Sequence, residues 1–297
     1  MAGIEWTIFI SKGLSLPRLI SQFELMHGMI EIPFLGRVIP SRIYFGNEFC
    51  QHLIPTLEEV KSAYNLAIDL ECSFTLVTPY VTEDGLKKLI PLFEFLSNHT
   101  KGVEIVINDW GVMNLIHREY PSLVLVLGRL MNKMPRDPRV TRHYNIPGVP
   151  KDALAFPQQS NVTIQSYRTL LKSYGINRVE LDNVFQGIDM DFNKLELEAS
   201  IYISYGYVTT GRICLSGNLN LTREKKFVSG NRCSKECQRY EVSLSNTNSI
   251  FEDKDLILHH VGNTVFYSQE EDMVLKAVEG CISNGINRII YQPAIPM

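Results

Sequence analysis

The residues with the clearest potential for chemistry are four cysteines from two distant parts of the chain. They are Cys50, Cys214, Cys233 and Cys237. Eighteen residues separate Cys214 from Cys233, and three separate Cys233 from Cys237. In a reducing compartment, gathered thiolates usually hold a soft metal centre. A set of four suits an iron–sulfur cluster, which takes four thiolates, and a group of unrelated thiols is the alternative.

The spacing of the last two cysteines narrows the kind of centre. A zinc knuckle prefers two residues between paired cysteines, whereas Cys233 and Cys237 have three between them. A radical-SAM triplet would need another cysteine shortly after Cys237, and position 240 is Tyr240. One distant cysteine and a local group of three remain compatible with a cluster.

Three short segments around these cysteines resemble a known family. They are residues 43–50 (IYFGNEFC), residues 205–214 (YGYVTTGRIC) and residues 233–237 (CSKEC). Together they resemble the UbiU/UbiV-type branch of the collagenase-like peptidase family, family U thirty-two. The resemblance covers residues 41–297 and is closest around the cysteines. The segment between Cys214 and Cys233 is longer here than in that branch.

The resemblance implies a cofactor and a class of reaction. It implies a [4Fe–4S] cluster on the four cysteines at the C-terminal rim of a barrel. It also implies oxygen-independent hydroxylation, or a related modification, of an aromatic or isoprenoid, quinone-like small-molecule substrate. Proteins of this branch work in pairs, so we expect a heterodimer with a homologous partner. An RNA-base hydroxylation factor and a non-catalytic scaffold with a structural cluster are the alternatives.

Composition and missing motifs exclude several other classes. The 297 residues carry a net charge of −3, which argues against a large nucleic-acid footprint. No apolar run is long enough to span a bilayer, and no secretory signal pattern opens the chain. We therefore expect a cytoplasmic protein without a membrane span. No Gly-x-Ser-x-Gly elbow or His-Glu-x-x-His motif occurs, which argues against peptidase activity.

Strand and helix patterns alternate from residue 41 onward and would position the cysteines. The expected strands are 42–45, 74–78, 103–107 and 123–127, and the expected helices are 57–70 and 82–98. A weak repeat, in which a glycine ends a helix and a strand starts at once, is centred on Gly102, Gly175 and Gly285. Such units imply parallel, buried strands. They favour a (β/α) TIM-like barrel, regular or irregular, over a doubly wound open sheet.

This pattern also predicts the division of the chain. Residues 1–40 form an N-terminal extension, in which Trp6–Ile10 is a strand candidate. Residues 41–297 form the barrel-like domain, with a cysteine-rich cluster loop at 214–237. Residues 132–159, rich in proline and arginine, form a long loop that is either a connector or a lid.

Four polar residues at predicted strand ends are the candidate catalytic residues, because barrel active sites lie there. Asp109, Glu180 and Asp182 could act as acid or base or orient a substrate. Carboxylates at strand ends also often accept hydrogen bonds from loop amides. Arg129 follows an apolar strand and either pairs with a carboxylate such as Asp109 or receives an anion.

The remaining two cysteines are expected to be structural. Cys281 lies at helical spacing from Val274 and Val278, where a thiol acts as a small apolar group. Cys72 lies at a helix-to-strand junction, away from the predicted rim.

Overall fold

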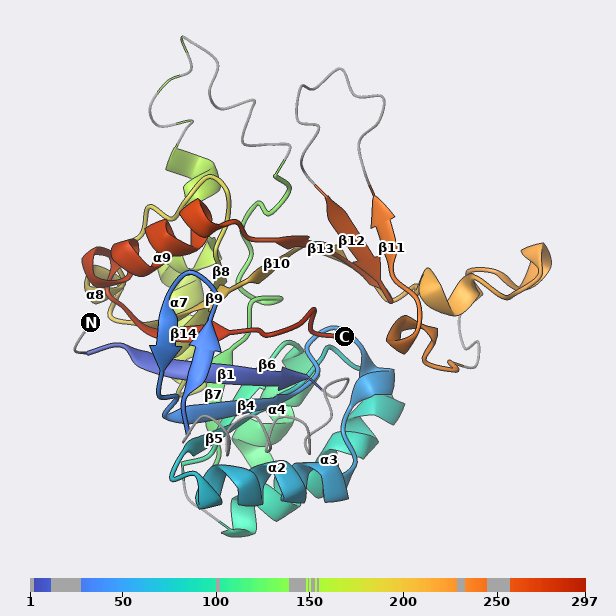
Figure 1. The fold of residues 1–297 in the computed structure, drawn as a ribbon. Helices are drawn as coiled ribbons and strands as arrows, with labels where there is room; N and C mark the ends of the chain where they lie inside the picture. Colours follow the sequence, from blue (N-terminus) through green and yellow to red (C-terminus); the bar gives the residue numbers. More distant parts are fainter. Residues whose placement is uncertain are drawn as a thin grey trace.

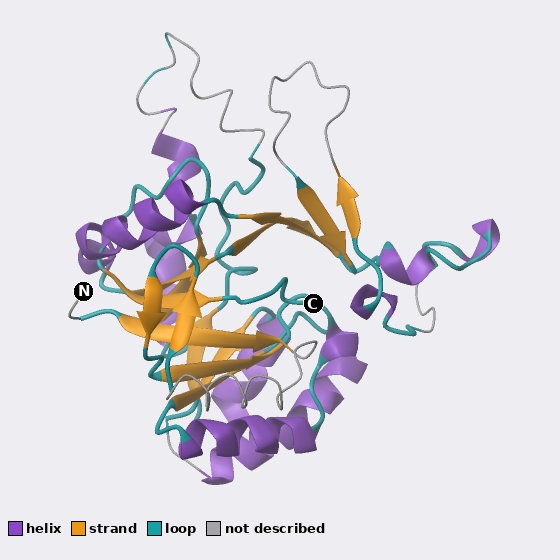
Figure 2. Ribbon diagram, viewed as in Figure 1, coloured by secondary structure: helices purple, strands orange, loops and turns teal. Residues whose placement is uncertain are grey.

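A closed barrel and a smaller antiparallel sheet form the protein, as seen in a computed structural model (Figures 1 and 2). The structure describes residues 3–11, 28–99, 102–138, 148, 150, 153, 155–228, 233–244 and 257–297.

Eight parallel strands close the barrel in chain order. They are β1 (Glu5–Ser11), β4 (Arg42–Gly46), β5 (Ser73–Val77), β6 (Glu104–Ile107), β7 (Val124–Leu127), β8 (Arg178–Asp182), β9 (Glu198–Ile203) and β14 (Ile286–Tyr291). The prediction of a TIM-like barrel is confirmed, and the open-sheet alternative is wrong. Closure removes the exposed strand edges that an open sheet would leave.

The barrel begins earlier in the chain than the sequence indicated. Residues 1–40 were expected to lie outside it, yet β1 pairs with β4 on one side and β14 on the other. In this register Phe9 lies beside Tyr44, and Trp6 lies beside Ile289. The strand candidate Trp6–Ile10 was therefore sound, but its place was missed because its closing partner lies at the other end of the chain. Only the hairpin of β2 (Ile30–Ile32) and β3 (Gly36–Val38) forms a separate sheet in the described part of this segment.

The helices follow the local signals in the sequence. Thr56 and Glu59 form a capping box at the start of the first of them, and Gly285, at φ 73°, ends the last one just before β14. The described helices are α2 (Leu57–Asp69), α3 (Glu83–His99), α4 (Trp110–Glu119), α7 (Gln165–Ser173), α8 (Phe192–Leu195) and α9 (Glu271–Asn284). No described helix has the length and apolar character needed to cross a membrane.

Alternating side chains divide each barrel strand between two cores. On β4, Tyr44 points into the barrel, where it packs with residues such as Phe9 and Tyr202. Its neighbours Ile43 and Phe45 belong to the larger core between the strands and the helices. The period of two in a β-strand therefore places one face inside the barrel and the other against the helices.

A second sheet, which the sequence did not predict, leaves the barrel after β9. Ser204, with a positive φ of 83°, separates β9 from β10. The strands of this antiparallel sheet, in spatial order, are β10 (Tyr205–Thr210), β13 (Thr264–Ser268), β12 (Leu258–Val261) and β11 (Val242–Leu244). In Figure 1 it extends to the side toward which the arrowhead of β1 points, so it belongs to the C-terminal end of the barrel.

Aromatic residues join the second sheet to the barrel. Phe49, just past β4, contacts the rings of Tyr207 on β10 and Phe266 on β13, each at 5.2 Å between centroids. All three side chains are buried, as are Leu130 and Met297 of the same cluster. The second sheet is thereby held against the barrel rim.

Candidate functional site

The fold brings the four predicted ligand cysteines to one end of the barrel. Cys50 lies directly after β4 and precedes the short turn η1 (Gln51–Leu53). Cys214 follows β10, and Cys233 and Cys237 lie at the turn η6 (Glu236–Gln238), which packs against η4 (Ser216–Asn218). Cys50 and Cys237 both pack against the aromatic joint around Phe49. The chain between Cys214 and Cys237 is thus an excursion from the second sheet, not a loop of the barrel itself.

The thiols of this group influence one another electrostatically. The pKa of Cys50 is raised to about 11, mainly by burial and in part by the neighbouring Cys233 and Cys214. Burial likewise raises the pKa of Cys237 to about 12, with added contributions from the other three thiols. Such effects need short distances, because charge interactions weaken with separation. We call these four residues the cysteine group.

Backbone amides point at the sulfur atoms of the cysteine group. The Gly217 N–H donates to Sγ of Cys214 over 3.2 Å, and the Lys235 N–H donates to Sγ of Cys233 over 3.4 Å. Backbone hydrogen bonds from His52 and Leu53 lower the pKa of Cys50 against the larger, raising effect of burial. N–H donors of this kind stabilise sulfur in its charged, ligand form.

Cys72 and Cys281 lie apart from the cysteine group. The Cys72 thiol donates to the Pro40 carbonyl over 3.3 Å, and the Cys281 thiol donates to the Ala277 carbonyl over 3.1 Å. Both side chains are buried in the core between strands and helices. This environment agrees with the structural role expected for both residues.

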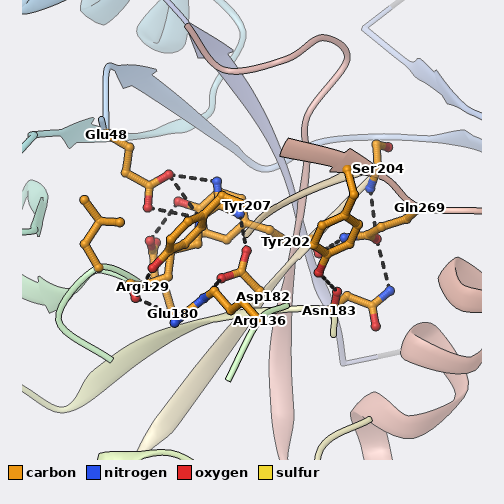
Figure 3. A network of polar contacts seen from close by, with 12 residues as sticks. Glu48, Arg129, Arg136, Glu180, Asp182, Asn183, Tyr202, Ser204, Tyr207 and Gln269 are labelled. Atoms are coloured by element: carbon orange, nitrogen blue, oxygen red, sulfur yellow. Dashed lines mark hydrogen bonds and ion pairs between the residues drawn. The ribbon is translucent and has the colours of Figure 1, made fainter. Parts of the chain in front are cut away.

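A buried charge network lies beside the barrel rim (Figure 3). The Arg129 guanidinium donates to Glu48, with the shortest contact at 2.8 Å, and to Asp182 over 2.6 Å. Asp182 also accepts from Nε of Arg136 over 2.5 Å. The Arg129 guanidinium stacks over the Tyr202 ring with 3.8 Å from Cζ to the centroid. The Arg129, Glu48 and Asp182 side chains are fully buried, so this network is shielded from water.

Glu180 is the most perturbed carboxyl of this region. Its Oε2 accepts from the Tyr202 hydroxyl over 2.7 Å, and its buried Oε1 has no hydrogen-bond partner among the described residues. The pKa of Glu180 is raised to about 8, mainly by burial and in part by the nearby charge of Glu48. Glu180 therefore holds a proton at neutral pH inside the barrel.

The four candidate catalytic residues have different environments. Arg129 was expected to pair with a carboxylate such as Asp109 or to receive an anion; it does pair with carboxylates, but these are Glu48 and Asp182 and not Asp109. Asp109 caps α4 by accepting from the backbone N–H groups of Gly111 and Val112. Arg129, Glu180 and Asp182 are fully buried, whereas Asp109 lines a cavity.

Sequence reasoning missed Glu48, the main partner of Arg129. The sequence did contain a signal for Glu48, which stands two residues past the end of β4 and two residues before Cys50. Arg136 was noted only as part of the proline- and arginine-rich loop, yet it is buried and stacks on Tyr207 at 4.6 Å from Cζ to the ring centroid. Further residues of that predicted loop, Arg139, Arg142 and Pro147, lie outside the described residues.

A cavity of 610 Å³ opens at the C-terminal end of the barrel. It lies between the ends of β5, β6 and β7 and the strand β10 of the second sheet. The lining residues with aromatic rings or positive charge are Tyr80, Trp110, Lys133, Arg136, Tyr207 and Arg212. Its size falls within the range of small-molecule sites, roughly 300–1,000 Å³.

Tyr80 connects the cavity to the cysteine group. Its side chain lines the cavity. The Asn263 amide that binds its hydroxyl also donates to the carbonyl of Phe49, the residue before Cys50, and Tyr80 and Cys50 pack against the same aromatic cluster. Its hydroxyl donates to the Gly211 carbonyl over 2.5 Å and accepts from the Asn263 amide over 2.8 Å. A molecule in the cavity would therefore lie one aromatic side chain away from Cys50.

Comparison with known proteins leaves the family open. No protein family model matches this sequence, and no curated protein matches it at a significant level. Among solved structures, a U32 peptidase aligns with 10% identity and a TM-score of 0.40, over 99% of this chain and 95% of that one. The spore cortex-lytic enzyme SleL of Bacillus cereus aligns with 10% identity and a TM-score of 0.39, over 97% of this chain and 70% of that one. Values this low assign neither a family nor an activity.

The raised pKa of Glu180 predicts a pH-dependent difference in stability. Between its ordinary value of 4.5 and about 8, the unfolded chain ionises this carboxyl while the folded chain keeps it protonated. Rising pH therefore favours unfolding of the wild-type protein across this window. We expect Glu180→Gln, which cannot ionise, to become more stable relative to wild type at pH 8 than at pH 5.

The measurement is the urea midpoint of both proteins at the two pH values. Glu196→Gln is the matched control, because Glu196 is an exposed carboxylate paired with Lys172. Its midpoint should follow that of wild type with pH. If the difference between Glu180→Gln and wild type is the same at both pH values, Glu180 does not carry a raised pKa.

Proposed function

We propose that this protein binds one [4Fe–4S] cluster on Cys50, Cys214, Cys233 and Cys237. We further propose that it takes part in oxygen-independent hydroxylation, or a related modification, of an aromatic or isoprenoid, quinone-like substrate in the reducing cytoplasm. The observation that supports this most is the gathering of four thiols from distant parts of the chain at the C-terminal end of a (β/α) barrel. The resemblance around the same cysteines supports the reaction class and a homologous partner chain.

The type of donor supports the proposal of a cluster, because four thiolates are the set that an iron–sulfur cluster takes. A tetrahedral zinc site with bonds of 2.3 Å needs sulfur atoms about 3.8 Å apart. In the described part of the chain, no three His, Cys, Asp or Glu side chains are arranged to hold one metal ion. A cluster places each thiolate on a different iron and so accepts wider spacing. The backbone N–H groups of Gly217 and Lys235 would stabilise two of the ligating sulfurs.

The residues around the proposed cluster suit a catalytic role as well as a structural one. When bound, a [4Fe–4S] cluster supplies one-electron redox chemistry. Hydroxylation of a ring C–H with water as the oxygen source releases two protons and two electrons, so it needs an electron acceptor as a second substrate. The cavity would hold the substrate, and Tyr80 would separate it from Cys50. Glu180, which is buried inside the barrel, can keep a proton at neutral pH.

Metal analysis of the full chain, purified without oxygen, tests the cluster. We expect brown protein with close to four iron and four sulfide per chain. Stoichiometric zinc without sulfide would exclude the cluster and, with it, the redox chemistry.

Profiling of a strain that lacks this protein, grown without oxygen, tests the reaction. A missing hydroxylated quinone precursor supports the proposal. A missing RNA modification would instead support RNA-base hydroxylation. Unchanged quinone precursors and unchanged RNA would support a non-catalytic scaffold. Co-purification of a homologous chain would support the heterodimer.

A further inference from the structure

In the described part of the chain, the wall of the cavity beside the cysteine group carries more positive than negative charge. Lys133 and Arg212 line it from two sides, one after β7 and one after β10. Neither side chain forms an ion pair within the described residues. Burial lowers the pKa of Lys133, and the charge of Arg136 lowers it further, which marks a cation beside another cation.

Arg136 belongs to the wall and is not available to a ligand. Its Nε pairs with Asp182, and its Nη2 donates to the carbonyls of Arg129 and Asn132, each over 2.8 Å. Its Nη1 donates to the carbonyl of Met134 over 3.0 Å. Its charge is therefore offset by Asp182, and its planar group is held in place under the Tyr207 ring.

The charges that remain on the described cavity wall sum to one positive unit. Lys133 and Arg212 contribute two positive charges. Asp109, the only carboxylate among the described lining residues, contributes one negative charge. This balance suits a monoanion. A dianionic phosphate would need more compensation and would meet Asp109, whose carboxylate already occupies the first backbone N–H groups of α4.

Aromatic side chains form the other part of the wall, which we call the aromatic wall: Tyr80, Trp110 and Tyr207. Trp110 is 49% exposed, and its ring lies edge-on to that of Tyr167 at 6.3 Å between centroids. Flat aromatic side chains favour a flat ring between or against them. The guanidinium of Arg212 lies 5.8 Å from the centroid of the Tyr80 ring, so charge and ring surface are adjacent.

The two cations are attached to backbone that is held in place. The Lys133 N–H donates to Oδ1 of Asn161 over 2.8 Å, and the Asn161 N–H donates to the Lys133 carbonyl over 3.0 Å. Gly211, next to Arg212, accepts from Tyr80 and from Asn263. Only the outer parts of these two side chains must become ordered when a ligand binds, which lowers the entropic cost.

We propose that this cavity binds a small aromatic carboxylate. Lys133 and Arg212 hold its carboxylate, and its ring lies against the aromatic wall. The cavity is larger than a single benzoate ring, which leaves room for substituents such as a hydrocarbon tail. This inference deepens the proposed function by naming its substrate class, and it rests on that function only for the chemistry that follows binding.

Calorimetric titration of the full chain, purified without oxygen, tests the proposal with four probes: benzoate, benzamide, acetate and phenyl phosphate. We expect benzoate to bind at least about tenfold more tightly than benzamide, which lacks the charge, and than acetate, which lacks the ring. Phenyl phosphate should bind more weakly than benzoate. Equal binding of benzamide, tighter binding of phenyl phosphate, or no binding of benzoate would each overturn the proposal.

Substitutions place the binding in the cavity. Lys133→Gln and Arg212→Gln should each weaken benzoate at least about tenfold, and both side chains are exposed enough for the fold to tolerate the change. Lys194→Gln is the matched control, because Lys194 is an exposed lysine that pairs with Asp191 on α8. Unchanged binding in both cavity variants would refute the proposed site.

Iron content, measured on the same samples, separates the two proposals. Benzoate binding to protein without iron would contradict the proposed cluster and support the carboxylate site. Protein that contains iron but does not bind benzoate would contradict the carboxylate site alone.

Discussion

Cys237→Ser protein, purified without oxygen, is expected to lose most of the iron and the visible absorbance of the wild-type chain. A serine oxygen is a hard, protonated donor and replaces a soft thiolate poorly at iron. Loss of one ligand also opens a coordination site on the cluster. The loss of iron should be close to complete, because Cys237 is partly buried and lies near the other three proposed ligands. Iron, sulfide and absorbance per chain are the readouts.

The control for this prediction is Cys281→Ala. Cys281 is buried in the helix-facing core and donates to the Ala277 carbonyl, so its loss costs only about 1–2 kcal/mol for a small cavity. Iron content should be unchanged. Loss of iron in both variants would show that the effect comes from destabilised folding and not from a missing ligand.

Cys50→Ser is the sharper test of how the site is assembled. Cys50 is the one proposed ligand from the first part of the chain, and it reaches the others only through the barrel and the joint around Phe49. We expect it to lose iron as Cys237→Ser does. Full iron and absorbance in Cys50→Ser would leave a three-cysteine site with a different fourth ligand.

Arg129→Met is expected to lower the free energy of unfolding by about 3–5 kcal/mol. The substitution removes a fully buried guanidinium and leaves Glu48 without its cation, while Asp182 keeps Arg136. An uncompensated buried carboxylate must either ionise at high cost or take up a proton. Burial already raises the pKa of Glu48. Without Arg129 we therefore expect Glu48 to take up a proton and the folded protein to lose stability. Urea denaturation under argon, followed by circular dichroism, measures the change.

Two further variants show whether charge or packing causes the loss. Adding Glu48→Gln to Arg129→Met should recover part of the stability, because the orphaned carboxylate is gone. Lys172→Met is the surface control, since Lys172 and Glu196 are 47% and 74% exposed and such pairs contribute roughly 0–1 kcal/mol. Purely additive losses in the double variant would contradict a charge-based explanation.

The buried network also has a positional consequence. The Arg129 carbonyl accepts from Nη2 of Arg136 and from the Tyr207 hydroxyl over 3.2 Å, and both of these residues line the cavity. Arg129 therefore holds part of the cavity wall although it is not itself a lining residue. We interpret Arg129 and Asp182 as positioning residues for the cavity rather than as groups that touch a substrate.

Local patterns in the sequence were enough to predict most barrel elements. The helices at 57–70 and 82–98 correspond to α2 and α3, and the strands at 42–45 and 123–127 correspond to β4 and β7. These elements are encoded by apolar periodicity, caps and glycine stops within a few neighbouring residues. The same signals indicated repeated βα units and hence a barrel.

The second sheet could not be inferred in this way. Its strands are short. β13 pairs with β10 across the excursion that carries Cys214 and Cys237, and β12 pairs in turn with β13. A strand of four residues with two histidines, His259 and His260, has little pattern of its own. Its stability comes from the pairing and from the aromatic joint to the barrel, which are long-range contacts.

By itself, the sequence determined the βα units and the absence of familiar hydrolase motifs, and it predicted four ligand cysteines and two core cysteines. Only the tertiary structure decided that β1 closes the barrel, that Arg129 pairs with Glu48 and not with Asp109, and that a charged cavity lies beside Cys50. The physical reason is the range of the interactions. Helix caps and strand periods act between near neighbours, whereas barrel closure, ion pairing and cavities depend on residues that meet only after the chain has folded.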